Sequence, residues 1–103
     1  MVRIAIPPIP SDPPKNKEEA AVRVGNESLK VLIDAQWKYG LTAIDIATIA
    51  WMNVTQFYKA LAFESGNKDK MADDFMESAK RVEAMIRSDS MKFDWEKQLE
   101  DGR

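Results

Sequence analysis

Apolar residues recur at every third or fourth position through most of this chain, which is the spacing of one face of an α-helix. The clearest stretch carries four apolar side chains and one glutamine on a common face: Leu29, Leu32, Ile33, Gln36 and Trp37. The stretch predicts a helix that ends at Tyr39, because Gly40 suits the left-handed conformation just past a helix terminus. A shorter, alanine-rich helix is expected over residues 17–24, separated from the longer one by Gly25 and Asn26.

A further helix is predicted to begin after Thr42. Thr42 and Asp45 have the spacing of a capping box, in which the hydroxyl and the carboxylate each accept a hydrogen bond from a backbone amide. Gly66 marks the predicted end of this helix. A second cap-like pair begins at Asn53, so the sequence leaves open whether residues 43–65 form one helix or two.

Two more amphipathic segments complete the chain. The apolar stripe of the first consists of Met71, Phe75, Ala79, Val82 and Ile86. Its opposite side carries charges that can form ion pairs four residues apart: Asp73, Glu77, Lys80 and Arg81. A short terminal helix is expected to begin at Ser88 and Asp89 and to carry Met91, Trp95 and Leu99. These patterns predict an all-α fold, a small bundle of four to five helices.

The first sixteen residues differ from the rest because they hold all five prolines. Proline fixes φ, disfavours helix in the residue before it and removes an amide donor, so we expect an extended arm. The chain therefore divides into a proline-rich arm, residues 1–16, and a helical domain, residues 17–103. The arm positions expected to bind a partner are Val2, Ile4, Ile6, Pro7, Pro8, Ile9 and Pro10. The sequence leaves open whether the arm packs on its own helices or on a neighbouring chain.

Composition narrows the chemistry of the chain. Its 103 residues are 45% hydrophobic, which suits one modest core with Ile33 and Phe75 in the middle of their stripes. The absence of cysteine and histidine removes thiolate and imidazole groups, the common metal ligands, nucleophiles and bases. The net charge of -2 gives no overall attraction to phosphate groups. We expect no enzymatic activity, no cofactor, no metal site and no small-molecule substrate.

The most apolar stretch, residues 41–63, carries only two charges, Asp45 and Lys59. The uncharged run between them is shorter than the roughly 20 residues that a bilayer requires, so we expect no membrane span. The first residues lack the apolar region of a signal peptide. An intracellular, cytoplasmic location, or one within an assembled particle, is therefore expected.

The segment between Asp45 and Leu61 resembles a helix-turn-helix of the repressor type. A small residue, Ala47, stands where two helices would cross. The hydrophobic positions also match: Ile46, Ala50, Met52, Phe57 and Ala60. The segment departs from the motif at Trp51, which replaces the glycine of the turn. The resemblance implies three side chains that face DNA: Thr55, Gln56 and Lys59. One unbroken core helix explains the same residues.

The leading interpretation is a non-enzymatic assembly or docking subunit. It would bind other protein subunits, or copies of itself, through the arm and the helical body, as a component of a virus particle or another large complex. The alternative is a helix-turn-helix DNA-binding protein, either a regulator or a DNA-packaging accessory.

Overall fold

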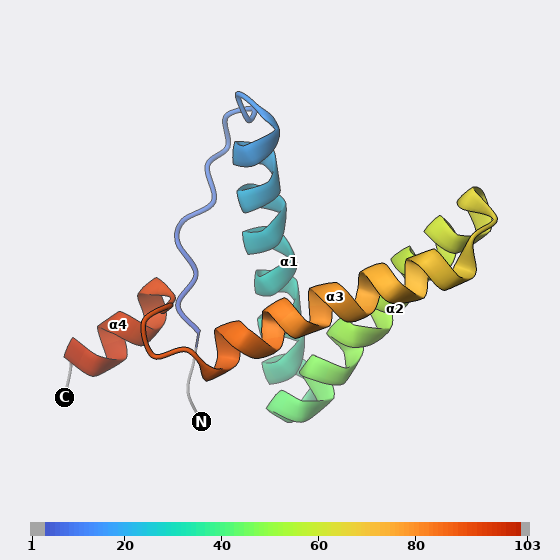
Figure 1. Ribbon diagram of the computed structural model, residues 1–103. Helices are drawn as coiled ribbons and strands as arrows, with labels where there is room; N and C mark the ends of the chain where they lie inside the picture. Colours follow the sequence, from blue (N-terminus) through green and yellow to red (C-terminus); the bar gives the residue numbers. More distant parts are fainter. Residues whose placement is uncertain (1–3, 102–103) are drawn as a thin grey trace. The chain divides into compact units, whose positions relative to one another are not determined.

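The computed structural model describes residues 4–101, and the described chain is all-helical, as the sequence predicts. Its four helices, shown in Figure 1, are α1 (Lys17–Tyr39), α2 (Ala43–Ser65), α3 (Lys68–Arg87) and α4 (Asp94–Asp101). No strand occurs between residues 4 and 101. Residues 4–16 contain no helix, and Val2 lies outside the described residues.

The chain divides into two compact units, one up to Ile46 and one from Ala47 onward. The boundary between the units lies within α2. The first unit contains residues 4–16, α1 and the beginning of α2. The second contains the rest of α2, α3 and α4.

Helix α1 is continuous, so the predicted break at Gly25 and Asn26 is wrong. Asn16 caps the helix instead, and its side chain accepts a hydrogen bond from the Glu19 amide at 2.8 Å. One glycine inside a helix costs only about 1 kcal/mol, which the surrounding backbone hydrogen bonds offset. The predicted end is confirmed, because Gly40 adopts the left-handed conformation with φ 63°.

Helix α2 begins with the predicted capping box. The Thr42 amide donates to the Asp45 carboxylate at 2.9 Å, and the Asp45 amide donates to the Thr42 hydroxyl at 3.1 Å. The helix then continues without interruption to Ser65, and Gly66 follows with φ 66°. The turn that a helix-turn-helix requires near Trp51 is therefore absent. No glycine or proline interrupts this stretch, so the hydrogen-bond ladder continues through it.

The capping box gives a testable pH effect. The hydrogen bonds from Thr42 hold the pKa of Asp45 below its usual range. Because the pKa of Asp45 is lower in the folded chain than in the unfolded chain, its ionised carboxylate stabilises the folded state. This stabilisation is fully present above the unfolded-state pKa and is lost as pH falls through the folded-state pKa. The larger cause of this shift is the hydrogen bond from the Thr42 backbone amide, which Thr42→Ala keeps, and the smaller cause is the Thr42 side chain, which it removes. We therefore expect Thr42→Ala to raise the pKa of Asp45 part of the way toward its ordinary value and to destabilise the helix by the loss of its cap. An NMR titration of the Asp45 carboxyl checks the shift, and an unchanged pKa would contradict it.

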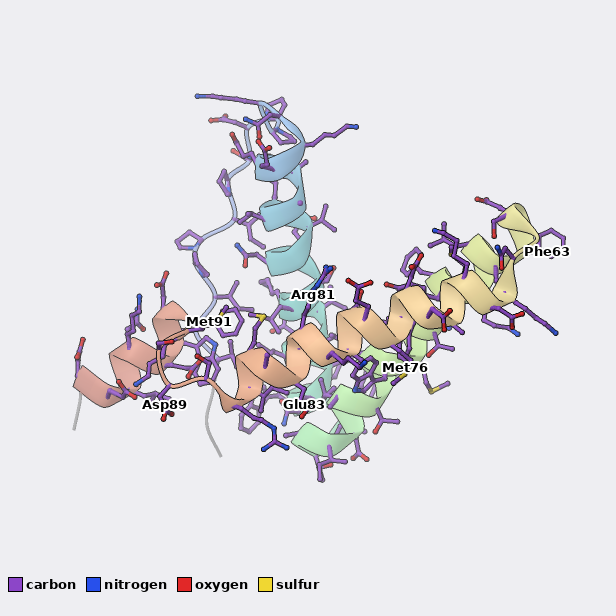
Figure 2. All side chains as sticks on the ribbon, in the orientation of Figure 1. Phe63, Met76, Arg81, Glu83, Asp89 and Met91 are labelled. Carbon is purple, nitrogen blue, oxygen red and sulfur yellow. The ribbon has the colours of Figure 1, made fainter. Side chains whose placement is uncertain are left out.

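Helix α3 lies antiparallel to α2 after a turn at Gly66 and Asn67 (Figure 1). The Asn67 side chain caps α3 by accepting a hydrogen bond from the Lys70 amide at 3.1 Å. One of the predicted ion pairs is confirmed on its exposed side, where Arg81 lies 2.9 Å from Glu77. Figure 2 shows Arg81 extending from α3. Such exposed pairs contribute little to stability, so α3 depends on its apolar side.

Helix α4 begins at Asp94, later than predicted, and Met91 precedes it. The cause is local, because the Ser88 hydroxyl accepts hydrogen bonds from the amides of Ser90 and Met91 at 3.3 and 3.2 Å. These bonds form a turn where the sequence suggested the first turn of a helix. The Phe93 amide then donates to the Glu96 carboxylate at 3.1 Å.

Few side chains of the described residues are buried. Ile33 and Gln36, both on α1, are 8% and 9% exposed, whereas α2, α3 and α4 contain no buried residue. Among the described residues, none of the helices has the length and hydropathy of a membrane span. The fold therefore leaves many apolar side chains in contact with water.

Candidate docking surfaces

The first candidate surface lies in the first unit, between α1 and the residues that precede it. An open groove of about 670 Å³ is lined by Ile4, Ala5, Ile6, Pro7, Pro8, Ile9, Lys30, Ile33 and Asp34. The isoleucines that precede α1 are half-buried, while the neighbouring prolines are exposed. The Arg23 guanidinium also donates a hydrogen bond to the Asp12 carbonyl. Of the residues predicted to bind a partner, Ile4, Ile6, Pro7, Pro8 and Ile9 thus line a groove with α1 of their own chain, and the two prolines are exposed.

The second surface is the apolar side of the hairpin formed by α2 and α3. Phe75 of α3 makes edge-to-face contacts with Trp51 and Tyr58 of α2, at centroid distances of 5.5 and 5.4 Å. The Tyr58 and Ser78 hydroxyls form a hydrogen bond at 3.2 Å. These contacts hold the two helices together. An open apolar groove of about 340 Å³ runs beside them, with Ala47, Ala50 and Ala79 among its lining residues.

The third surface is a separate apolar face of α2. We call it the second face of α2, because another face of this helix packs against α3. It consists of Ile46, Ile49, Asn53, Phe57 and Ala60. Each residue of an α-helix is rotated by 100° about the helix axis from the one before it. The centre of the second face therefore lies roughly 130° around α2 from the side that carries Trp51, Val54 and Tyr58. Phe57 is 74% exposed, and Ile49 is also exposed. Helix α2 is therefore apolar in two directions, and α3 covers one of them.

The sequence-based interpretation named Ile46, Phe57 and Ala60 as hydrophobic positions of a helix-turn-helix, but it did not recognise them as one face of a continuous helix. The signal was present in the composition of α2, where only three of 23 residues are charged: Asp45, Lys59 and Glu64. A helix that is hydrophobic on most sides is normally buried on most sides. Such a composition predicts a central helix with more than one neighbour.

The three residues assigned to DNA lie on the remaining, polar side of α2. Thr55, Gln56 and Lys59 are all exposed. The Thr55 hydroxyl donates to the Trp51 carbonyl at 2.8 Å, so it is engaged with its own helix. Lys59 and Thr55 line a shallow groove of about 190 Å³ with residues of α3. The structure places the three side chains near one another but on a continuous helix.

The described residues offer no metal-binding cluster of three or more Asp and Glu side chains. Besides Asp45, another titratable group has a shifted pKa: the hydrogen bond from Lys92 to Glu100 raises the pKa of Lys92. Neither Asp45 nor Lys92 lies in a groove described above. Apolar surface, rather than a set of reactive groups, is the distinctive feature of this chain.

No protein-family model, curated protein or solved structure matched this chain.

Proposed function

We propose that this chain is a non-enzymatic subunit that docks onto other protein subunits through its helical body and its N-terminal arm. The observation that carries the proposal is the exposure of α2. This helix has only three charged residues, and none of its residues is buried. Contiguous exposed apolar surface is typical of a protein interaction site. A component of a virus particle or of another large complex fits this description.

The exposed side chains supply a physical driving force for association. Ile44, Phe57 and Phe63 of α2 are 78%, 74% and 90% exposed. Figure 2 shows Phe63 extending from the end of α2 near the turn into α3. Full burial of one such side chain contributes roughly 1.5 to 3 kcal/mol. Covering several of them compensates for the freedom that two molecules lose when they associate.

The arm contributes in a different way. Pro7 and Pro8 line the groove beside α1, and both they and Pro10 are exposed. A proline-rich segment loses little conformational entropy when it binds. Proline-rich segments are recurrent ligands of aromatic-lined grooves. We therefore assign the prolines to docking and the half-buried isoleucines to attachment of the arm.

DNA binding by Thr55, Gln56 and Lys59 stays a prediction from the sequence. The continuous helix lacks the turn that would present a recognition helix in the major groove. No feature of the described residues favours DNA over protein as the partner, so we do not propose it as a second function.

The proposed function is tested by the mass of the chain in its own cells. A chain tagged at its C-terminus and produced at its natural level should elute from a sizing column in a complex of several subunits. Native mass spectrometry of that fraction gives its composition. A chain that is found only as a monomer, both in the extract and after purification, would rule out a docking function.

A further inference from the structure

We propose that the second face of α2 binds the same face of a second copy of this chain, with the two helices antiparallel and a two-fold axis beside Asn53. This inference rests on the proposed docking function and names one partner. The argument uses the order of residues along α2, the chemistry of Asn53 and the charges at the helix ends.

The second face is arranged symmetrically about Asn53. Ile49 and Phe57 lie four residues to either side of it, and Ile46 and Ala60 lie seven residues to either side. In a two-fold antiparallel pair, each residue meets the one at the equal distance on the other side of the axis. Ile49 would therefore pack against Phe57 of the second copy, and Ile46 against the small Ala60. Large residues thus meet apolar partners without two phenylalanines colliding.

Asn53 is the one polar residue of the second face, and it is exposed in the single chain. An apolar partner would bury its amide without a hydrogen bond, which is unfavourable. A second Asn53 across a two-fold axis removes this cost, since each amide has both a donor and an acceptor. Paired asparagines at the centre of a helix interface are known to fix register and partner number.

The charges at the ends of α2 favour the antiparallel direction. Glu64 lies eleven residues after Asn53, and Thr42, just before the start of α2, lies eleven residues before it. The pairing therefore brings the Glu64 carboxylate beside the N-terminus of the second α2, which carries the positive end of the helix dipole. A parallel pair would instead place the two Glu64 side chains together. The Asp45 carboxylate accepts a hydrogen bond from the Thr42 amide at 2.9 Å, so it lies near this contact and partly offsets the attraction of Glu64 to the helix end.

The pairing is compatible with the hairpin. Trp51, Val54 and Tyr58 lie on the side of α2 that faces α3, and the second face contains none of them. Substitutions on the second face should therefore alter association without unfolding the hairpin.

The first experiment measures the mass of the full-length chain by analytical ultracentrifugation over a range of micromolar concentrations. We expect a monomer–dimer equilibrium, and we expect Phe57→Glu to raise the dissociation constant at least about 30-fold, because it buries a charge against Ile49 of the second copy. The matched control is Phe63→Glu, which introduces the same charge on α2 at a more exposed phenylalanine outside the second face. It should change the dissociation constant by less than about threefold.

The second experiment uses the absence of cysteine in this chain, which makes single-cysteine variants unambiguous. Two Asn53→Cys side chains at a two-fold axis lie within disulfide distance and should form a covalent dimer under mild oxidation. Met52→Cys, one residue away and 60% exposed, points in another direction and should form no covalent dimer under the same oxidation. Circular dichroism of each variant confirms that the helices are intact.

The outcomes separate this inference from the proposed function. A purified chain that is monomeric at all concentrations, or equal cross-linking through residues 52 and 53, would overturn the α2 pair. If that monomer still elutes within a larger complex from its own cells, docking stands and only the second copy is excluded. Dimers that Phe57→Glu dissociates and Phe63→Glu does not would support the pair.

Discussion

Replacing Phe75 with alanine is expected to destabilise the hairpin of α2 and α3 by about 3 kcal/mol, the largest effect of any single substitution that we predict. Phe75 contacts both Trp51 and Tyr58 through its ring, so the substitution removes two aromatic contacts and leaves a void between the helices. We place the loss toward the low end for phenylalanine because Phe75 is half-buried. Urea unfolding followed by circular dichroism measures it.

Met76→Ala is the control for this experiment. Met76 is the next residue on α3 and is 54% exposed. We expect its loss to change the free energy of unfolding by no more than about 0.5 kcal/mol. Equal effects at positions 75 and 76 would mean that the aromatic contacts do not hold the hairpin together.

Deleting residues 1–10 is expected to abolish docking into the larger complex while the helices remain folded. Residues 4–10, the described part of the deleted segment, contain no helix, and the deletion keeps Asn16, the cap of α1. It also keeps Arg23, which bonds to the Asp12 carbonyl. The far-ultraviolet circular dichroism per helical residue should therefore change little, whereas the share of chain that co-elutes with its partners should fall to background.

A variant that retains the arm but alters its prolines refines this test. Replacing Pro7, Pro8 and Pro10 with alanine leaves the isoleucines against α1 and removes the rigid, exposed positions. We expect a partial loss of docking. If the truncated chain instead loses much of its helicity, the segment serves the stability of α1 and does not act as a docking arm.

The sequence predicted the helix ends well because they depend on a few neighbouring residues. Gly40 and Gly66 adopt the left-handed conformation, and the pair Thr42 and Asp45 makes both bonds of the capping box. The break at Gly25 was predicted wrongly because a local propensity of about 1 kcal/mol does not outweigh a cooperative hydrogen-bond ladder.

The candidate surfaces were harder to predict, since they depend on which residues meet across the fold. The pattern alone did not show that Phe75 would take Trp51 and Tyr58 as partners and leave Phe57 outside. The position of Ile4 beside α1 likewise depends on contacts between residues that are distant in sequence. Periodicity identifies an apolar face, but it does not identify what covers that face.

The two-residue turn at Gly66 and Asn67 also bears on the order of events after synthesis. The contacts between α2 and α3 join residues close in sequence, and helical hairpins of this kind fold within microseconds to milliseconds. Association of subunits is slower and depends on concentration. Newly made chains should therefore fold first and wait for a partner with Phe57 exposed, which makes them candidates for chaperone binding and proteolysis. Under the proposed α2 pair, the fraction of chains lost in this way should then fall as the concentration of the chain rises.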